Sequence, residues 1–243
     1  MKARFWKTCS AGVLGVVLLL GYGGVILAET TAADVEQALQ ALSLSQGEKI
    51  LEAFKIGFVQ GHLLPEETLR LVTRLTVAEG SPAEKEAILL TLASALMDDL
   101  PGKILVDKTL EGLSRGVPLS QIGQQVSIRA RLLVEVRDLL YSKGILVATE
   151  GQAASSFLLP ARFDLLVIHI ADALGEYLEG GGSPLDGFLL EEVVHLRLSK
   201  LEGVVIPVDD VELVLARITA GDLSRVVLEV LDWPSERTKS LSE

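Results

Sequence analysis

Two histidines and two carboxylates have the spacing of a metal site. His169 and Asp172 lie three residues apart in the sequence. Glu192 and His195 have the same spacing. Residues three apart share one face of a helix, so each pair would present both side chains together. In an antiparallel hairpin about Gly182, histidine would lie level with histidine and carboxylate with carboxylate. Such a set, projecting from facing helices, suits zinc or iron.

The same four residues also fit two polar stripes that face water. One stripe consists of His169, Asp172, Glu176 and Glu179, and the other of Glu191, Glu192, His195, Ser199 and Glu202. Stripes of this kind are typical of amphipathic helices. A ferritin-like centre would need a second Glu-x-x-His motif, which the sequence lacks. Solvated stripes are therefore the preferred interpretation, and the metal site is the alternative.

The segment from Gly112 to Gly116 matches the G-x-S-x-G pattern of hydrolases, with Ser114 in the nucleophile position. That motif requires a strand that runs into a sharp turn and then a helix. Here the preceding residues have helical periodicity and Pro118 follows. We interpret the pattern as a helix C-terminus.

Other polar residues have less specific surroundings. His62 follows Gly61 in a turn, with no partner nearby in the sequence, and is expected to be solvated. Three arginines alternate with acids along one helical segment, which predicts a solvated, mixed-charge face; they are Arg129, Arg131 and Arg137. The sequence contains neither a phosphate-binding glycine loop nor an H-E-x-x-H helix, and no cofactor is expected.

Helical periodicity and helix-end signals dominate, so the sequence predicts an all-α fold. About ten helices are expected, over residues 32–43, 46–60, 65–79, 82–98, 102–115, 118–142, 160–179, 184–202, 207–220 and 222–231. Serine-led capping segments predict three of the starts: Ser45 with Glu48, Ser81 with Glu84, and Ser183 with Asp186. Glycines predict αL ends at Gly116, Gly144, Gly180, Gly203 and Gly221.

Turn residues recur in the same order in two parts of the chain. Leu-Leu-Pro occurs at 63–65 and 158–160, and Gly-Ser-Pro occurs at 80–82 and 182–184. This recurrence predicts an internal duplication of a four-helix unit, packed as one superhelical array. The alternative is that helical chains reuse proline at starts and glycine at ends. The expected segments are a signal peptide (1–28), a helical pair (29–62), unit 1 (63–143), a linker (144–157), unit 2 (158–232) and a tail (233–243).

The first 28 residues have the organisation of a secretory signal peptide. Lys2, Arg4 and Lys7 precede an apolar run from Ala11 to Ala28. If the run is not cleaved, it is long enough to anchor the chain in a membrane. The body of the protein lies outside the cytoplasm in both cases, periplasmic or secreted.

Charge and cysteine content exclude several classes of function. The formal net charge is −11, which disfavours nucleic acid and anionic membranes as partners. The single cysteine, Cys9, lies within the expected signal, so the remainder has neither a disulfide nor a thiolate site. Trp233 is expected to pack on the last helix, with a binding anchor as the alternative.

These observations predict an exported binding or scaffold protein of the cell envelope, with a protein partner and without an identifiable catalytic site. A carrier for an apolar ligand is the alternative, because the mean hydropathy of +0.42 is high for a helical chain. A metal-dependent enzyme that uses His169, Asp172, Glu192 and His195 is the third possibility.

Export leads to a direct prediction. Protein recovered from outside the cytoplasm should begin near Glu29, because cleavage after Ala28 would remove the charged start and the apolar run. N-terminal sequencing or intact mass measures this. A soluble cytoplasmic product that retains Met1 would contradict it.

Overall fold

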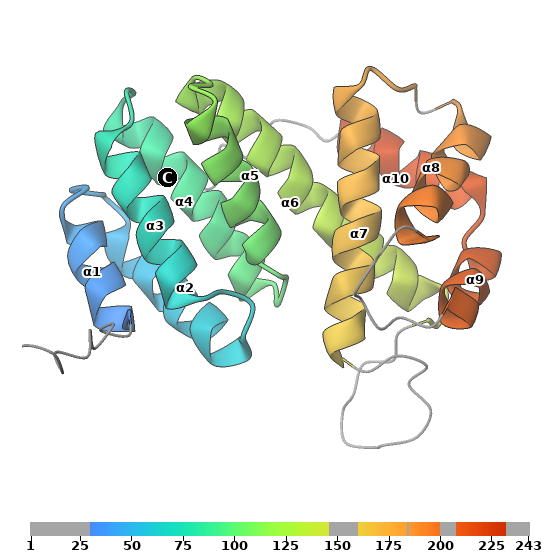
Figure 1. Cartoon of the computed structure of the whole chain (residues 1–243), viewed down its shortest axis with the longest axis horizontal. Coiled ribbons are helices and arrows are strands. Elements are labelled where there is room, and N and C mark those ends of the chain that lie inside the picture. Colours follow the sequence, from blue (N-terminus) through green and yellow to red (C-terminus); the bar gives the residue numbers. More distant parts are fainter. Residues whose placement is uncertain (1–29, 146–159, 184, 200–207, 232–243) are drawn as a thin grey trace, which may run out of the picture. The chain divides into compact units, whose positions relative to one another are not determined.

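The computed structural model describes residues 30–145, 160–183, 185–199 and 208–231, and within these ranges it contains ten helices and no strand (Figure 1). In chain order the helices are α1 (Ala32–Gln40), α2 (Gly47–Gln60), α3 (Pro65–Val77), α4 (Pro82–Met97), α5 (Lys103–Ser114), α6 (Leu119–Ser142), α7 (Pro160–Glu179), α8 (Gly187–Ser199), α9 (Val208–Arg217) and α10 (Ala220–Leu231). The predicted all-α class is confirmed. The expected signal peptide, most of the linker and the tail lie outside the described residues.

Three helix boundaries differ from the sequence prediction by about one turn, one of them the end of α9, which is Arg217 instead of residue 220. The first helix ends at Gln40, and Ser43 adopts a left-handed conformation with φ of 51°. The eighth begins at Gly187 because Ser183 forms a separate turn, in which its carbonyl accepts from the Asp186 N–H. The capping prediction for Ser183 is therefore wrong.

The other capping predictions have mixed outcomes. The box of Ser81 and Glu84 is confirmed: Ser81 Oγ accepts from the Glu84 N–H at 3.2 Å, and Glu84 accepts from the Ser81 N–H at 2.8 Å. The box at Ser45 is wrong, because its hydroxyl donates to Glu86 of α4 at 2.8 Å. Two further capping boxes, which were not predicted, are present at Thr31 with Asp34 and at Thr219 with Asp222.

The glycine predictions are correct for two of the four described positions. Gly116 and Gly144 have φ of 70° and 65° at helix ends. After α7 the positive φ falls on Gly181 instead of Gly180. Gly221 was predicted to end a helix, but it lies in the first turn of α10, which Thr219 caps. Gly203 is outside the described residues.

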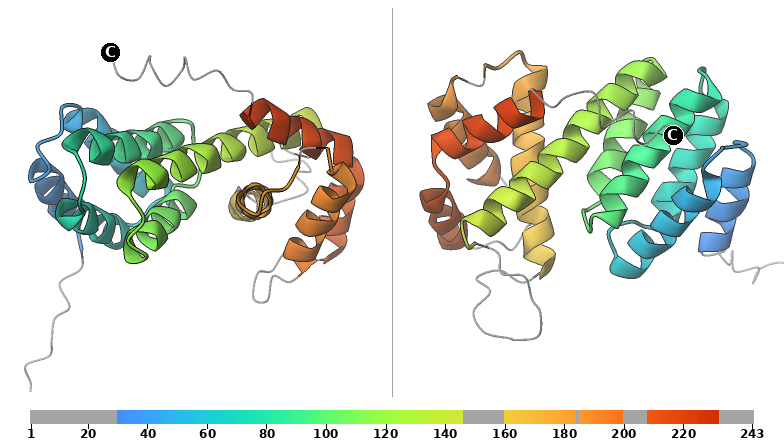
Figure 2. Two further views of the ribbon diagram at one scale, coloured as in Figure 1. Left: turned by 90° about the horizontal axis from the view of Figure 1, so that it is seen from above. Right: turned by 180° about the vertical axis from the view of Figure 1, so that it is seen from behind.

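The helices pack in two connected groups within the unit Thr31–Glu243. In the first group alternate helices are neighbours: α1 contacts α3 and α3 contacts α5, while α2 contacts α4 and α4 contacts α6. In the second group α6, α7, α8 and α10 contact one another in a closed ring, and α9 contacts α8 (Figure 2). Helix α6 belongs to both groups.

Three contacts define how the neighbours of α6 run. Leu119, at the start of α6, lies so close to Gly80, just before α4, that a Cβ on Gly80 would clash with it. Arg137, near the end of α6, donates a hydrogen bond to the carbonyl of Asp98, just after α4. Helices α4 and α6 therefore run in the same direction. Lys143, after the end of α6, pairs with Asp222 in the first turn of α10, so α10 runs the opposite way.

The Lys143–Asp222 ion pair links the end of α6 to the first turn of α10. The Lys143 Nζ lies 2.7 Å from the Asp222 carboxylate. This hydrogen bond, aided by those from Thr219, lowers the pKa of Asp222 from 3.8 to about 2. Further along the same interface burial raises the pKa of Glu135, and the facing Glu229 carboxyl adds to the effect.

We expect Asp222→Asn to destabilise the fold by about 1–2 kcal/mol at pH 7, a value reduced for partial exposure of Lys143. The folded pKa of about 2 is below the unfolded 3.8, so the carboxylate stabilises the protein above pH 3.8. This contribution is lost as pH falls toward 2. Urea unfolding at several pH values should show the difference from wild type vanish near pH 2.

The matched control is Glu212→Gln on α9, an exposed acid, which should change stability little. Lys143→Gln should reproduce most of the loss seen for Asp222→Asn, because it removes the other half of the pair. A pH-independent loss for Asp222→Asn would show that the charge of the Asp222 carboxylate does not cause the stabilisation.

Candidate functional site

A charged hollow of about 520 Å³ lies beside α5 and α7, with one residue of α6 in its wall. Its cations are Lys103, Lys108, Arg115 and Arg129, and its acids are Asp107, Glu111, Asp172, Glu176 and Glu179. His169, Ile104, Leu165 and Ile168 complete the lining. Two of the four residues of the predicted metal site, His169 and Asp172, are thus in this wall.

Arg129 is the largest fully buried side chain among the described residues, with 1% exposure. Its Nη1 donates to the Asp172 carboxylate at 3.0 Å and to the carbonyls of Asp172 and Ala171 at 2.6 and 3.2 Å. Its Nη2 donates to the Glu179 carboxylate at 3.2 Å. A buried guanidinium requires partners of this kind, because an unpaired charge in the interior costs several kcal/mol.

The guanidinium reaches the backbone of α7 because residue 175 is glycine. A Cβ on Gly175 would lie 2.0 Å from both the Cζ and the Nη1 of Arg129. No side chain can be accommodated at that distance. The Arg129 side chain therefore packs directly against the backbone at Gly175, and this contact joins α6 to α7.

The ion pairs continue from Arg129 to α5. Glu179 also accepts from Lys108 of α5 at 3.1 Å, so one carboxylate joins three helices. On α5 itself Glu111 pairs with Lys108 at 3.5 Å and with Arg115 at 2.7 Å. This chain of charges holds α5, α6 and α7 together along the hollow.

The fourth cation of the hollow is also engaged. Lys103 hydrogen-bonds to Glu67 of α3, which is the main reason that its pKa is raised, and it lies 3.3 Å from Asp107. An anionic ligand would have to compete with these carboxylates for every cation. The geometry favours a structural joint over an anion site.

The structure separates the residues of the predicted metal site. Asp172 is paired with Arg129, while Glu192 and His195 are exposed on α8. Across the described residues, no three side chains among His, Cys, Asp and Glu form a group that could hold a metal ion. The metal hypothesis stays a prediction that metal analysis of the purified protein can test.

The interpretation of the Gly112–Gly116 segment as a helix end is confirmed. Helix α5 continues to Ser114, and the chain then turns through Gly116. The Ser114 hydroxyl donates to the carbonyl of Glu111 at 2.8 Å, as is common in the last turn of a helix. The strand that a nucleophile elbow requires is not present here.

The expected solvation of His62 and Arg129 is wrong. The His62 side chain is only 11% exposed, and its Nε2 lies 2.9 Å from the Asp99 carboxylate. Its carbonyl accepts from the Gly102 N–H at 3.1 Å, so it ties the turn after α2 to the turn after α4. Arg129 is buried because α7 covers it, a contact between residues distant in the sequence.

Comparisons with protein-family models, curated proteins and solved structures find no match to this chain.

We expect Gly175→Ala to destabilise the protein by about 1–3 kcal/mol, because the new Cβ must push the Arg129 guanidinium away from α7. The matched control is Gly123→Ala on α6. A Cβ there would meet Ile88 at 3.6 Å, an ordinary contact. Since alanine favours a helix over glycine by about 1 kcal/mol, the control should be neutral or stabilising.

Denaturant unfolding followed by circular dichroism measures both changes. Equal effects of the two substitutions would show that Arg129 does not depend on the space above Gly175.

Proposed function

We propose that this protein is an exported binding or scaffold protein and that α8 presents the surface that binds a protein partner. The observation that carries the proposal is an exposed apolar stripe on α8 and the turn before it. Leu185 is 87% exposed, Phe188 75%, Leu189 53% and Leu196 47%. Scattered exposed apolar residues are ordinary, but a contiguous group is characteristic of an interaction site.

Helix α8 is apolar on two opposite sides. Leu190 and Val194 are fully buried against the body of the protein. Leu189 and Leu196, seven residues apart, are exposed on the opposite side, and Leu185 lies in the turn just before the helix. A helix that is apolar all round normally packs on both sides. A partner protein that covers the outer side would bury this second face. The exposed Glu192, which lies four residues from both Phe188 and Leu196, and the exposed His195 would give the contact polar specificity.

The wall of the charged hollow favours a protein partner over an apolar ligand. The hollow beside α5 and α7 is lined mainly by charged residues, and a carrier for an apolar ligand needs a predominantly apolar lining. Exposed apolar side chains instead gather on the outer side of α8 and in the turn before it. The carrier hypothesis therefore has less support than the binding protein.

The proposed export depends on the charged start and the apolar run of the first 28 residues. Within the described ranges, no helix has the length and apolar character that crossing a membrane requires. A periplasmic or secreted body, held to the membrane only if the N-terminal segment is retained, is the proposed location.

The proposed duplication pairs α3–α6 with α7–α10, and the order of helices supports it. Helices α4 and α6 are neighbours, as are α8 and α10. Pro65 and Pro160 begin the first helix of each set. The alternating contacts of α1 to α6 are the arrangement expected of a superhelical array. An experimental structure in which residues 63–126 and 158–230 superpose would support the duplication.

A photoactivatable cross-linker at Phe188 tests the binding proposal. We expect it to capture one identifiable partner protein in the envelope fraction, whereas a cross-linker at Val77 on α3 should not. Val77 is the matched control because it is also apolar and 77% exposed. With the purified partner, Phe188→Asp should weaken binding at least about tenfold, which is 1.4 kcal/mol. Val77→Asp should leave the affinity unchanged.

Identical cross-linking from both positions would contradict a specific α8 surface. A product made of two copies of this chain would replace the proposed partner with self-association. Unchanged affinity of Phe188→Asp for the purified partner would place the interface elsewhere.

A further inference from the structure

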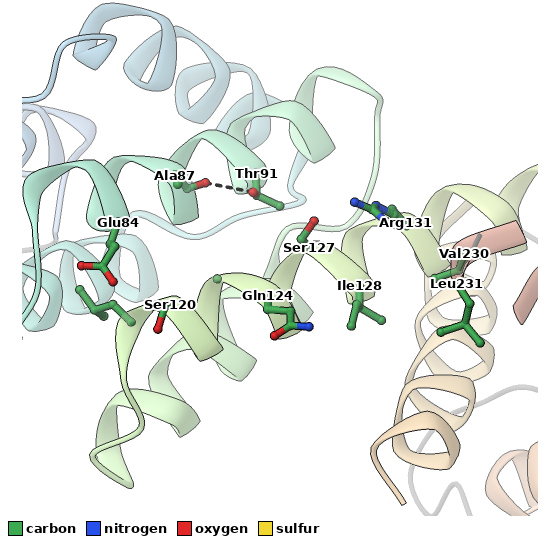
Figure 3. A pocket seen from close by; sticks show the side chains of 12 residues that line it. Glu84, Ala87, Thr91, Ser120, Gln124, Ser127, Ile128, Arg131, Val230 and Leu231 are labelled. Carbon is green, nitrogen blue, oxygen red and sulfur yellow. Dashed lines mark hydrogen bonds between the residues drawn. The ribbon is translucent and has the colours of Figure 1, made fainter. Parts of the chain in front are cut away.

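A second groove of about 520 Å³ runs along α6 between α4 and the end of α10 (Figure 3). Its apolar lining includes Leu119, Ile128, Val230 and Leu231. Hydroxyl and amide side chains line the rest, from Thr91, Ser120, Gln124 and Ser127. Such a mixture suits an extended polypeptide, whose backbone groups need hydrogen-bond partners while some side chains are apolar.

The groove has a charge of opposite sign at each end. Figure 3 shows Arg131 beside Val230 and Leu231, and Glu84 beside Ser120 at the other end. The lowered pKa of Glu84, caused mainly by its hydrogen bond with the Ser81 backbone, keeps that carboxylate ionised. A ligand that fits would carry an acid at the first end and a base at the second.

Helix α10 ends beside the Arg131 end of the groove. Helix α10 ends at Leu231, which is part of the lining. The next residues are Asp232, Trp233, Pro234, Ser235, Glu236 and Arg237. The segment thus begins with the acid Asp232, followed by the aromatic Trp233, and the base Arg237 comes five residues after Asp232.

We propose that this groove is the binding site for the chain's own segment 232–237, held in an extended conformation with Asp232 toward Arg131 and Arg237 toward Glu84. The lengths agree. Ser120 and Arg131 are eleven residues apart on α6, or roughly 16 Å at 1.5 Å per residue. An extended chain covers this distance in about five residues.

Trp233 would then lie over Ile128 and Leu231, next to the place where the segment leaves α10. The indole ring would cover apolar surface there, and its N–H would have the nearby hydroxyl and amide groups as acceptors. Pro234 favours the extended backbone that the groove requires. The occupied groove would fix the end of α10 against both α4 and α6.

The test uses the full chain with Trp6→Phe, so that Trp233 is the only tryptophan. We expect a blue-shifted emission and weak quenching by acrylamide. Gln124→Arg, which fills the groove, should increase the quenching constant about twofold as the indole ring returns to water. The matched control is Gln121→Arg, an exposed glutamine on α6 that lines the neighbouring hollow.

A second pair of variants tests the charge match without altering the helical body. Arg237→Glu should expose Trp233 as Gln124→Arg does, because it places two acids together at the Glu84 end. Lys239→Glu, beyond the reach of the groove, should not. The shielding should also be independent of protein concentration, as an intramolecular contact requires.

Strong quenching of Trp233 in the parent chain would overturn the proposal. So would shielding that none of the groove or segment variants changes, since Trp233 would then pack elsewhere. Loss of shielding on dilution would mean that the groove receives the segment of a second copy and would equally contradict it.

Discussion

The contact of Arg129 with Gly175 fixes the position of α7 on α6, the helix that both groups share. A guanidinium with 1% exposure is tolerated only when its donors are satisfied, and here two carboxylates and two backbone carbonyls satisfy them. The carbonyls are accessible because Gly175 has no side chain. Buried ion pairs contribute little net stability but are specific about geometry. The position of α7 on α6 is therefore defined by hydrogen bonds as well as by apolar packing.

Helix α6 connects nearly every feature described above. One side of α6 packs against α4, and another packs against α7 and α10. The groove runs along α6 between α4 and α10. Buried charge at Arg129 and ion pairing at Lys143 act at different points along the same helix. A change in the orientation of α6 would consequently alter the charged hollow and the groove together. The exposed apolar side chains of α8 do not line either of them.

Local signals predicted most helix boundaries, because caps and periodicity act within one or two turns. The box at Ser81 is local and was predictable, whereas Ser45 has the same local pattern but bonds to Glu86, 41 residues away. Arg129 belongs to an alternating charge pattern typical of a solvated face. Its burial depends on Gly175, and one glycine in an apolar helical segment gave no indication of that partner. The hollow and the groove combine residues from several helices, so sequence spacing alone could not predict them.

The position of Arg129 also has a consequence for the order of folding. The chain is synthesised from its N-terminus, so α6 exists before Pro160 and the rest of α7 have been made. Until then the guanidinium is hydrated, and the sides of α6 that α7 and α10 will cover are open to solvent. When α7 packs on α6, the Arg129 guanidinium loses its water at the same time as it gains its hydrogen-bond acceptors on α7. Helices α1 to α6 can assemble earlier through contacts between near neighbours, whereas the ring of α6, α7, α8 and α10 requires the last helix. We therefore expect ring closure to be a late step of folding.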